Sequence, residues 1–376
     1  MHVLHVGKYY PPYRGGIETV VEQLCRGLAT RGVEVTALVS NDGPRTIDET
    51  IAGVRVLRLG RSTELSSQPL NLRLVPTLRR LRFDALHFHT PNPVGALAVL
   101  AAHRPEPIVV THHSDIVRQR LLGGAATVAQ SLLYRRAGAL VAATPKHIEH
   151  SPALRRFESR CRVIHFPIDA QPYADAPAVW DEQLPSAWQN EPLVLFVGRL
   201  VYYKGVDVLL EALRLTENAR LAIVGIGPLS TRLAEQAARL GITERIKFLG
   251  AVPDGRLRSL YKCARFLVLP SVASSEAFGM VQLEAMAAGR PVISTDLKSG
   301  VPYVNLHGVT GLIVPPSDPG ALAAAMKTLL DDEPRALALG QAAQRRVLAE
   351  FHVDKVVDAH IELYASLLRK SARSAF

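Results

Sequence analysis

Residues 266–289 read Phe-Leu-Val-Leu-Pro-Ser-Val-Ala-Ser-Ser-Glu-Ala-Phe-Gly-Met-Val-Gln-Leu-Glu-Ala-Met-Ala-Ala-Gly and contain one unit of the fold. The unbroken apolar run at Phe266–Pro270 is typical of a strand that is buried on both faces of a parallel sheet. After a loop, a helix is predicted to begin near Gly279 and to end at Gly289. Strand, loop and helix in this order form the repeating unit of a doubly wound α/β sheet.

The same alternation extends in both directions, in two blocks separated by a stretch rich in Pro, Ala, Asp and Gln. Strands are predicted in the first block at Val3–Val6, Val33–Val39, Val54–Leu59, Ala85–Phe88, Ile108–Thr111, Ala139–Ala142 and Arg162–His165. Strands are predicted in the second block at Leu193–Val197, Ala219–Val224, Ile246–Leu249, Phe266–Pro270, Pro291–Ser294 and Gly311–Val314.

We therefore predict an α/β protein of two Rossmann-like, doubly wound domains that face a cleft. The N-terminal domain is expected over residues 1–170, a linker over 171–192 and the C-terminal domain over 193–352. Residues 353–376 are expected to form a final helix. Ligands of such sheets bind beyond the carboxyl ends of the strands, so the loops there are the place to look for a site.

Composition and cysteine content favour a cytoplasmic protein. The chain is 48% hydrophobic and 21% charged, as in globular proteins, and no apolar run approaches the ~20 residues of a spanning helix. The start, Met1–Val6, is interpreted as a buried strand and not a signal peptide. Its three cysteines lie far apart, without ligand-like spacing, which favours reduced thiols.

The net charge of +10 is concentrated in the first half. Residues 1–175 hold 22 Lys and Arg against 14 Asp and Glu, whereas residues 176–376 hold 22 against 20. A basic N-terminal half suggests an anionic partner, such as a membrane surface. The alternative is a base-composition habit, because Arg outnumbers Lys 35 to 9.

Two glutamates flank the predicted start of the helix at Gly279, namely Glu276 in the loop and Glu284 within the helix. The free N–H groups of the first turn favour an anion such as a diphosphate. Carboxylates beside a sugar nucleotide are suited to accept hydrogen bonds from hydroxyls, with Glu276 serving the sugar and Glu284 the ribose. The alternative is that acidic residues near a helix start only complement its dipole.

Two further loops support a diphosphate site. Arg199 and Lys204 precede a predicted helix, where cations are unfavourable unless an anion is bound, so they are candidate diphosphate ligands that stabilise the departing nucleotide. Solvated surface cations are the alternative. Gly15-Gly16, before the first helix of the other domain, would give a small anion-accepting nest, although a double glycine is more often a turn.

Histidines cluster after two N-terminal strands, in His87-Phe-His89 and in Thr111-His-His-Ser-Asp115. His87 and His89 share one face of a strand, but no carboxylate or thiolate motif joins them, so hydrogen-bonded structural histidines are expected and no metal site. Gly225-Ile-Gly-Pro228 resembles the start of a dinucleotide fingerprint but lacks the third glycine.

Together these motifs resemble the retaining family 4 glycosyltransferases of GT-B fold, over nearly the whole chain. The matching segments are Glu276-Ala-Phe-Gly-Met-Val-Gln-Leu-Glu284, Gly198-Arg-Leu200, Lys204-Gly205, Gly15-Gly-Ile-Glu18, Pro167-Ile-Asp169 and Val252-Pro-Asp254. The resemblance implies a nucleotide-sugar co-substrate, no other cofactor and no metal. It also implies that the final helix crosses back onto the N-terminal domain.

Site residues follow from the same resemblance. The implied donor-binding residues are Gly15, Gly16, Arg199, Lys204, Gly225, Val252, Glu276, Phe278, Gly279, Met280, Val281 and Glu284. The implied catalytic group is His113, Glu276, Arg199 and Lys204, with His113 beside the reacting carbon of the donor sugar. His112 is the other candidate for this histidine. Tyr13, His89 and His112 are candidates on the acceptor side.

The implied chemistry is departure of a nucleoside diphosphate while the acceptor hydroxyl attacks the same face. Resemblance of His89–Pro93, His113–Arg118 and Gly300–His307 to bacterial mannosyl- and rhamnosyltransferases of O-antigen and exopolysaccharide assembly favours GDP-mannose as donor. A polyprenyl-diphosphate-linked or oligosaccharide acceptor is then expected. The alternative is a UDP-sugar-dependent enzyme acting on a lipid or small molecule. Basic Leu78–Phe83 and Leu132–Arg136 would suit peripheral binding to the inner face of the cytoplasmic membrane, although amphipathic packing explains them equally.

Three other classes fit less well. An NAD-type oxidoreductase or epimerase needs a glycine-rich fingerprint after the first strand, and Gly7–Pro12 is not one. A non-catalytic nucleotide-sugar-binding protein would be expected to lose some of the Arg, Lys and Glu residues of the site, and all are present. Nucleic acid is not an expected partner, because no recognised module appears.

Overall fold

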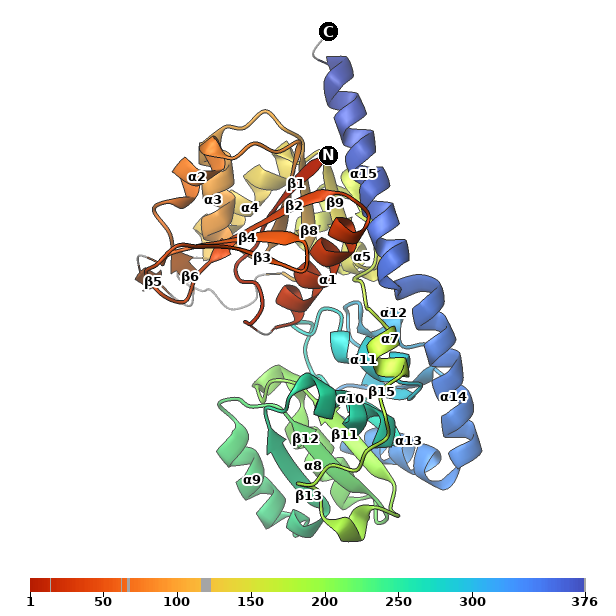
Figure 1. Ribbon diagram of the computed structural model, residues 1–376. Helices are drawn as coiled ribbons and strands as arrows, with labels where there is room; N and C mark the ends of the chain where they lie inside the picture. Colours follow the sequence, from red (N-terminus) through yellow and green to blue (C-terminus); the bar gives the residue numbers. More distant parts are fainter. Residues whose placement is uncertain (14, 62, 66–67, 116–122, 375–376) are drawn as a thin grey trace. The chain divides into compact units, whose positions relative to one another are not determined.

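The computed structural model describes residues 1–13, 15–61, 63–65, 68–115 and 123–374 (Figure 1). The chain divides into two compact units, one of Met1–Pro167 with Val353–Phe376 and one of Ile168–His352. Each unit is built on a mainly parallel sheet covered by helices, as the alternating pattern predicts.

The first unit contains an eight-stranded sheet of order β10-β9-β8-β7-β1-β2-β4-β3, in which β3 alone is antiparallel to its neighbour. Its strands are β1 (His2–Val6), β2 (Glu34–Ser40), β3 (Ile47–Ile51), β4 (Val54–Leu59), β7 (Ala85–Thr90), β8 (Ile108–His112), β9 (Ala139–Ala142) and β10 (Cys161–Val163). A short hairpin pairs β5 (Thr63–Leu65) with β6 (Gln68–Leu70). The helical segments are α1 (Gly16–Thr30), α2 (Leu74–Arg80), α3 (Pro93–Ala102), α4 (Gly123–Arg136), α5 (Pro145–His150), α6 (Pro152–Arg155), η1 (Glu158–Arg160) and α15 (Val353–Ser374).

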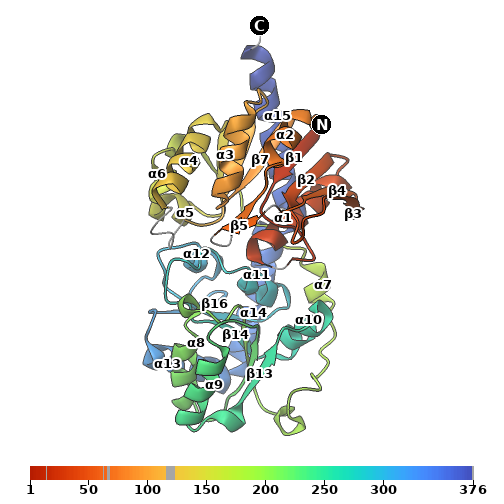
Figure 2. The ribbon, with the colours of Figure 1, turned by 90° about the vertical axis from the view of Figure 1, so that its left-hand side faces the viewer.

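Successive side chains of these strands point into two hydrophobic layers, as the period of a strand requires. One layer places Leu4 and Val110 against α2, α3 and α4, which lie together on one face of the sheet (Figure 2). The other places Val3 and Val109 against α1 and α15.

The last helix, α15, belongs to the first unit. Val357 and Tyr364 lie in the layer shared with α1, and Arg31 of α1 pairs with Asp354 and Asp358. This confirms the expectation that the chain returns to its N-terminal domain. Gly27 permits the close packing, since a Cβ there would lie 2.5 Å from a methyl group of Val357.

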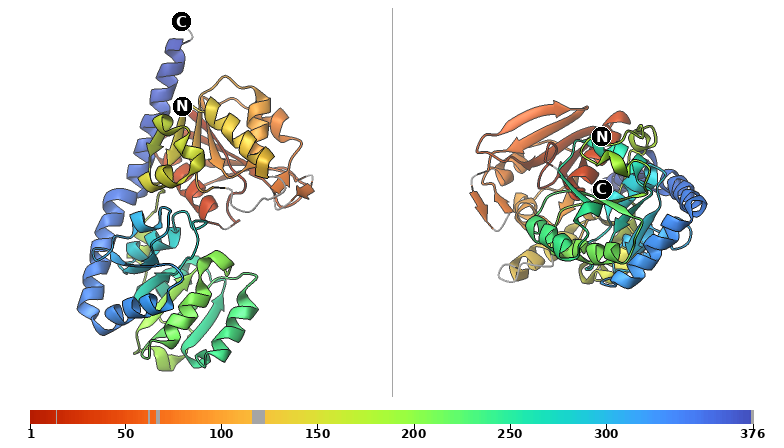
Figure 3. Two further views of the ribbon diagram at one scale, coloured as in Figure 1. Left: turned by 180° about the vertical axis from the view of Figure 1, so that it is seen from behind. Right: turned by 90° about the horizontal axis from the view of Figure 1, so that it is seen from below.

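The second unit contains a six-stranded parallel sheet of order β13-β12-β11-β14-β15-β16. Its strands are β11 (Leu193–Val197), β12 (Arg220–Val224), β13 (Ile246–Gly250), β14 (Phe266–Leu269), β15 (Val292–Thr295) and β16 (Gly311–Val314). Its helical segments are α7 (Gln171–Ala174), η2 (Ser186–Trp188), η3 (Tyr202–Lys204), α8 (Val206–Arg214), α9 (Ser230–Arg239), η4 (Thr243–Arg245), α10 (Asp254–Cys263), α11 (Met280–Ala287), α12 (Val301–Val304), α13 (Pro319–Asp331), α14 (Glu333–Arg346) and η5 (Val347–Phe351). Helices α13 and α14, in blue in Figure 3, pack against β16.

Residues 171–192, expected as a linker, lie within this second unit and carry α7 and η2. Side-chain contacts also attach this segment to the rest of the second unit. Two guanidinium nitrogens of Arg256, Nε and Nη2, donate to the carboxylate of Asp181 at 2.9 and 2.7 Å. Composition alone misses such contacts, because they join residues 75 positions apart.

Candidate active site

The second sheet reverses its direction of growth between β11 and β14, which are hydrogen-bonded neighbours. Ligands of open α/β sheets bind at such a switch point, beyond the carboxyl ends of the strands. The loops that follow the two strands run side by side here, and Val272 N donates to Tyr203 O at 2.8 Å. The two loops predicted from the sequence to form the site therefore meet.

Lys204 and Glu276 form a buried ion pair at this point. Lys204 Nζ lies 2.6 Å from Glu276 Oε2, and the two residues are 8% and 7% exposed. The hydroxyl of Ser271 also donates to Glu276 Oε2, at 2.9 Å. The ammonium group carries three protons, so Lys204 retains donors for a second anion while it is bonded to Glu276.

Helix α11 begins beside this pair at Gly279, which has a φ of +74° and provides no side-chain cap. A side chain at Gly279 would be strained by that φ and would place its Cβ 2.6 Å from Leu269. The backbone of Met280 and Val281 thus opens the helix without a capping side chain, as an anion site requires. Phe278 is buried and packs edge-to-face on Phe351, so its side chain stabilises the loop from within.

Glu284 lies on α11 and is held by a residue that the sequence did not indicate. The hydroxyl of Tyr261, on α10, donates to Glu284 Oε2 at 2.7 Å. Burial raises the pKa of Glu284, and the Tyr261 hydrogen bond opposes that rise. Glu284 Oε2 therefore accepts from Tyr261, and a carboxylate has further lone pairs with which to accept from a ligand.

The loop after β12 packs against the Arg199 loop and is also bonded to the end of β13. Gly225 N donates to Gly250 O at 2.7 Å, and a Cβ at Gly225 would lie 2.0 Å from Gly198 O, so only glycine permits this approach. Val252, in the loop after β13, is buried. Arg199 is exposed, and its guanidinium forms no ion pair or hydrogen bond with the residues that the structure describes.

In the first unit, β1 and β7 are the neighbours at the corresponding reversal of the sheet. The loop after β1 ends at Gly15, which precedes α1 without a side-chain cap, and α1 begins at Gly16. Tyr13 is 44% exposed and stacks on Tyr9 with ring centroids 4.1 Å apart. Burial raises the pKa of Glu18 in the first turn of α1.

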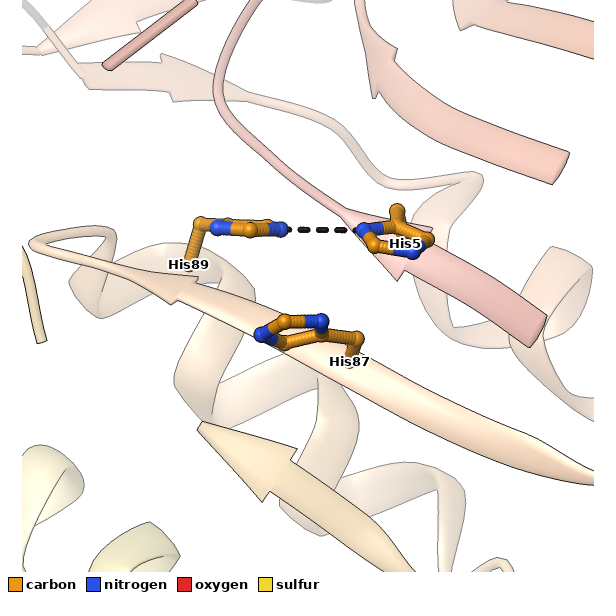
Figure 4. A group of neighbouring side chains, drawn as sticks. All are labelled: His5, His87 and His89. Atoms are coloured by element: carbon orange, nitrogen blue, oxygen red, sulfur yellow. Dashed lines mark hydrogen bonds between the residues drawn. The ribbon is translucent and has the colours of Figure 1, made fainter. Parts of the chain in front are cut away.

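Histidines from β1, β7 and β8 meet at the same edge. His5 Nδ1 lies 3.1 Å from His89 Nε2, as Figure 4 shows, and His89 Nδ1 lies 3.0 Å from His113 Nε2. The stacked rings of His87 and His89 confirm the predicted shared face. Burial lowers the pKa of His89 to about 3 and those of His5, His87 and His113 well below the usual value.

His112 and His113 point to different layers. His112 Nδ1 bonds the hydroxyl of Tyr134 at 2.7 Å, on the side of α4, and burial lowers the His112 pKa to about 4. His113 instead stacks on Phe166 at 4.8 Å and bonds His89. Their environments therefore differ although they are adjacent in sequence.

Two family models cover most of the chain. Residues 14–171 match Glycosyltransferase Family 4, and residues 181–346 match Glycosyl transferases group 1. The chain is 32% identical over 380 residues to the O-antigen chain mannosyltransferase C of Escherichia coli, covering 99% of this chain and 100% of that protein. The chain belongs to family 4 of the glycosyltransferases.

Two further relatives and one solved structure agree with this membership. The D-rhamnosyltransferase WbpZ of Pseudomonas aeruginosa is 36% identical over 354 residues, covering 92% of this chain and 91% of that protein. The GDP-mannose-dependent alpha-(1-6)-phosphatidylinositol monomannoside mannosyltransferase of Mycolicibacterium smegmatis is 30% identical over 366 residues, covering 92% and 94%. Sucrose-phosphate synthase from Thermosynechococcus elongatus superposes with a TM-score of 0.83 at 24% identity, covering 98% and 99%. The glycosyltransferase thus has the predicted GT-B fold.

The histidine cluster of this glycosyltransferase fits a hydrogen-bonded network better than a metal site. Ligand nitrogens of His5, His87 and His89 lie within 4.8 Å of one another (Figure 4), and those of His5 and His89 are joined by a hydrogen bond of 3.1 Å. Both nitrogens of His87 are bonded, to the hydroxyls of Tyr364 and Thr111. Imidazole–imidazole bonds likewise occupy both nitrogens of His89.

The described helices of this glycosyltransferase include none that is long and apolar enough to cross a membrane. The two basic segments are Leu78–Phe83 and Leu132–Arg136. Their side chains Leu78, Phe83 and Leu133 are buried in the first unit, so amphipathic packing accounts for the apolar half of each pattern. The exposed basic residues beside them are Arg79, Arg80, Arg82, Arg135 and Arg136.

Proposed function

We propose that this glycosyltransferase transfers mannose from GDP-mannose, with retention and without a metal, to a polyprenyl-diphosphate-linked sugar in the assembly of a cell-surface polysaccharide. The buried Lys204–Glu276 pair beside the uncapped start of α11 is the observation that carries the proposal. It provides a cation, backbone N–H groups and a hydroxyl acceptor at one point, as the diphosphate and sugar of a donor require. Mannosyl transfer is supported by the names of the E. coli and M. smegmatis relatives.

In the proposed reaction, Arg199 and Lys204 bind the diphosphate and stabilise the charge that develops on it as the bond from the sugar C1 to the phosphate oxygen breaks. The acceptor oxygen forms its bond to C1 on the same face. Its proton passes to the leaving phosphate oxygen, so no protein base is needed. Glu276 accepts from sugar hydroxyls, Glu284 from the ribose, and His113 lies beside the sugar.

In this proposal the first unit binds an anionic membrane surface, and the lipid-linked acceptor lies in that membrane. Its support is the group of exposed arginines around α2 and α4, with Leu132 of α4 45% exposed among them. Each such cation contributes about 1 kcal/mol of attraction near an anionic leaflet. Peripheral binding of this kind needs no spanning helix.

GDP is expected to raise the melting temperature more than UDP or ADP do. A ligand that binds only the folded state stabilises it by about 2.7 kcal/mol at 100 times its Kd. The measurement is a thermal-shift titration of the three diphosphates with the full chain, and Lys204→Met serves as the control that should lose the response. Stabilisation by UDP alone would end the mannosyl proposal, and no response to any of them would end the nucleotide-sugar proposal.

Tyr261→Phe is expected to weaken GDP binding about 10-fold, with partial recovery as the pH is raised. The Tyr261 hydroxyl orients Glu284 and opposes the rise of its pKa, so without it the carboxylate accepts less well from the ribose. A hydrogen bond to a charged group contributes about 1.5 kcal/mol, which corresponds to roughly 10-fold in affinity. Isothermal titration calorimetry with GDP and with 2′,3′-dideoxy-GDP isolates the contribution of the ribose hydroxyls to the loss of affinity, since only GDP has hydroxyls for Glu284. Equal losses for both ligands would contradict the role of Glu284 at the ribose.

A further inference from the structure

A buried chain of three imidazoles runs from His5 on β1, through His89 on β7, to His113 just after β8 (Figure 4 shows the first two). The two links are 3.1 and 3.0 Å long. The three residues are 0%, 2% and 3% exposed, so water does not replace either link. The family resemblance makes His89 a candidate on the acceptor side, whereas no sequence motif indicates His5.

The N–H groups of the three linked imidazoles must donate in the same direction along both links. Burial holds the three rings neutral, so each carries one N–H. Each link needs one donor and one acceptor, and His89 takes part in both links with opposite nitrogens. If His5 donates to His89, then His89 donates to His113; if His113 donates, the order reverses.

The closed end of the chain decides the direction. His5 Nε2 is buried and has no hydrogen-bond partner in the described residues. The reversed order would place the proton of His5 on this nitrogen, as an N–H without an acceptor. The forward order leaves only a lone pair there, and buried orphan N–H groups are the rarer of the two in native proteins.

Neither of the neighbouring rings, His87 and His360, provides an acceptor for an N–H at His5 Nε2. Both nitrogens of His87 are bonded to hydroxyls. His360 donates from Nδ1 to Val356 O at 2.8 Å, and its Nε2 also lacks a partner, so it is not within hydrogen-bond distance of His5.

The open end of the chain is Nδ1 of His113. That atom has no hydrogen-bond partner in the described part of the chain and, unlike His5 Nε2, is not among the fully enclosed nitrogens. The ring is fixed by its stacking on Phe166, and the backbone N–H of His113 bonds Thr90 O at 3.2 Å.

We propose that His5 and His89 are positioning residues that fix His113 as its Nδ1–H tautomer, so that this nitrogen donates a hydrogen bond to an oxygen of the transferred sugar. The tautomer follows from the three linked imidazoles alone, and the sugar contact rests on the proposed function. Specificity follows: His113 in this tautomer binds an oxygen acceptor and discriminates against a sugar analogue that has hydrogen in its place.

Long-range ¹H–¹⁵N correlation spectra of the histidine-labelled full chain test the tautomer directly. The expected pattern for His113, assigned with a His113→Gln variant, is a protonated Nδ1 and an unprotonated Nε2. An Nε2–H pattern in the wild-type protein would overturn the proposal. Addition of Zn²⁺ should leave the spectra of His5, His87 and His89 unchanged, and a stoichiometric shift of all three would show a metal site instead of a tautomer relay.

A matched pair at His5 tests the relay. His5→Asn keeps a donor at the position of Nδ1 and should preserve the His113 tautomer, whereas His5→Phe removes the donor and should populate Nε2–H at His113. Turnover, measured as nucleoside diphosphate released from the donor, should fall about 10-fold in His5→Phe and recover in His5→Asn. An unchanged tautomer in a folded His5→Phe overturns the relay. A shifted tautomer with unchanged turnover keeps the relay and contradicts the sugar contact of His113.

Discussion

Lys204→Met is expected to lower turnover by roughly 10²–10³-fold and to destabilise the second unit at the same time. Loss of one preorganised donor to a developing anion has a cost of that size. The stability effect has a separate cause: Glu276 would remain buried without its partner 2.6 Å away, and breaking one side of a buried ion pair costs about 3–5 kcal/mol. Turnover is measured as nucleoside diphosphate released, and stability by urea unfolding.

The double variant Lys204→Met/Glu276→Gln separates the two effects. It removes both charges, so we expect most of the lost stability to return while turnover stays low. Arg214→Met is the matched control, because Arg214 and Glu211 form an exposed pair 3.7 Å apart that contributes about 1 kcal/mol at most. Near-wild-type turnover in Lys204→Met would remove Lys204 from the site. A double variant as unstable as Lys204→Met would contradict the buried-charge explanation.

The sequence predicted the members of this site but not their pairing. Lys204 and Glu276 each follow an apolar run, and that local pattern places them beyond the ends of strands. Their contact depends on β11 and β14 being neighbours, which is a property of the strand order. Tyr261 was missed for the same reason, since it meets Glu284 only when α10 and α11 pack together.

The histidines show where strand periodicity is sufficient and where it fails. Period-2 spacing correctly placed His87 and His89 on one face. It gave no reason to add His5, which lies on a different strand from His87 and His89. The parallel register of β1 and β7 sets His5 opposite His87, and this register is fixed by contacts far apart in the sequence.

Acid is expected to destabilise the first unit steeply between pH 6.5 and 5. Burial lowers the pKa of His89 to about 3 and those of His112 and His360 to about 4. Below pH 6.5 the unfolded chain binds protons at these residues and the folded chain does not, so stability is full above pH 6.5 and is lost as the pH falls toward 4. Each group contributes up to about 1.4 kcal/mol per pH unit, or roughly 3–4 kcal/mol for the three between pH 6 and 5.

Urea unfolding followed by circular dichroism at pH 7.5, 6.5, 5.5 and 5.0 measures this loss. His360→Asn keeps a donor for Val356 O but cannot take up the proton. The slope of the unfolding free energy against pH should therefore decrease by the contribution of about one proton. His103→Asn is the control, since His103 is exposed at the end of α3 and asparagine tolerates its φ of +51°. Stability that stays flat from pH 7.5 to 5.0 would mean that the imidazoles take up protons in the folded state. The relay from His5 would then fail at acid pH, because a protonated His89 would donate from both nitrogens, so that His5 would accept from His89 and would no longer set the tautomer of His113.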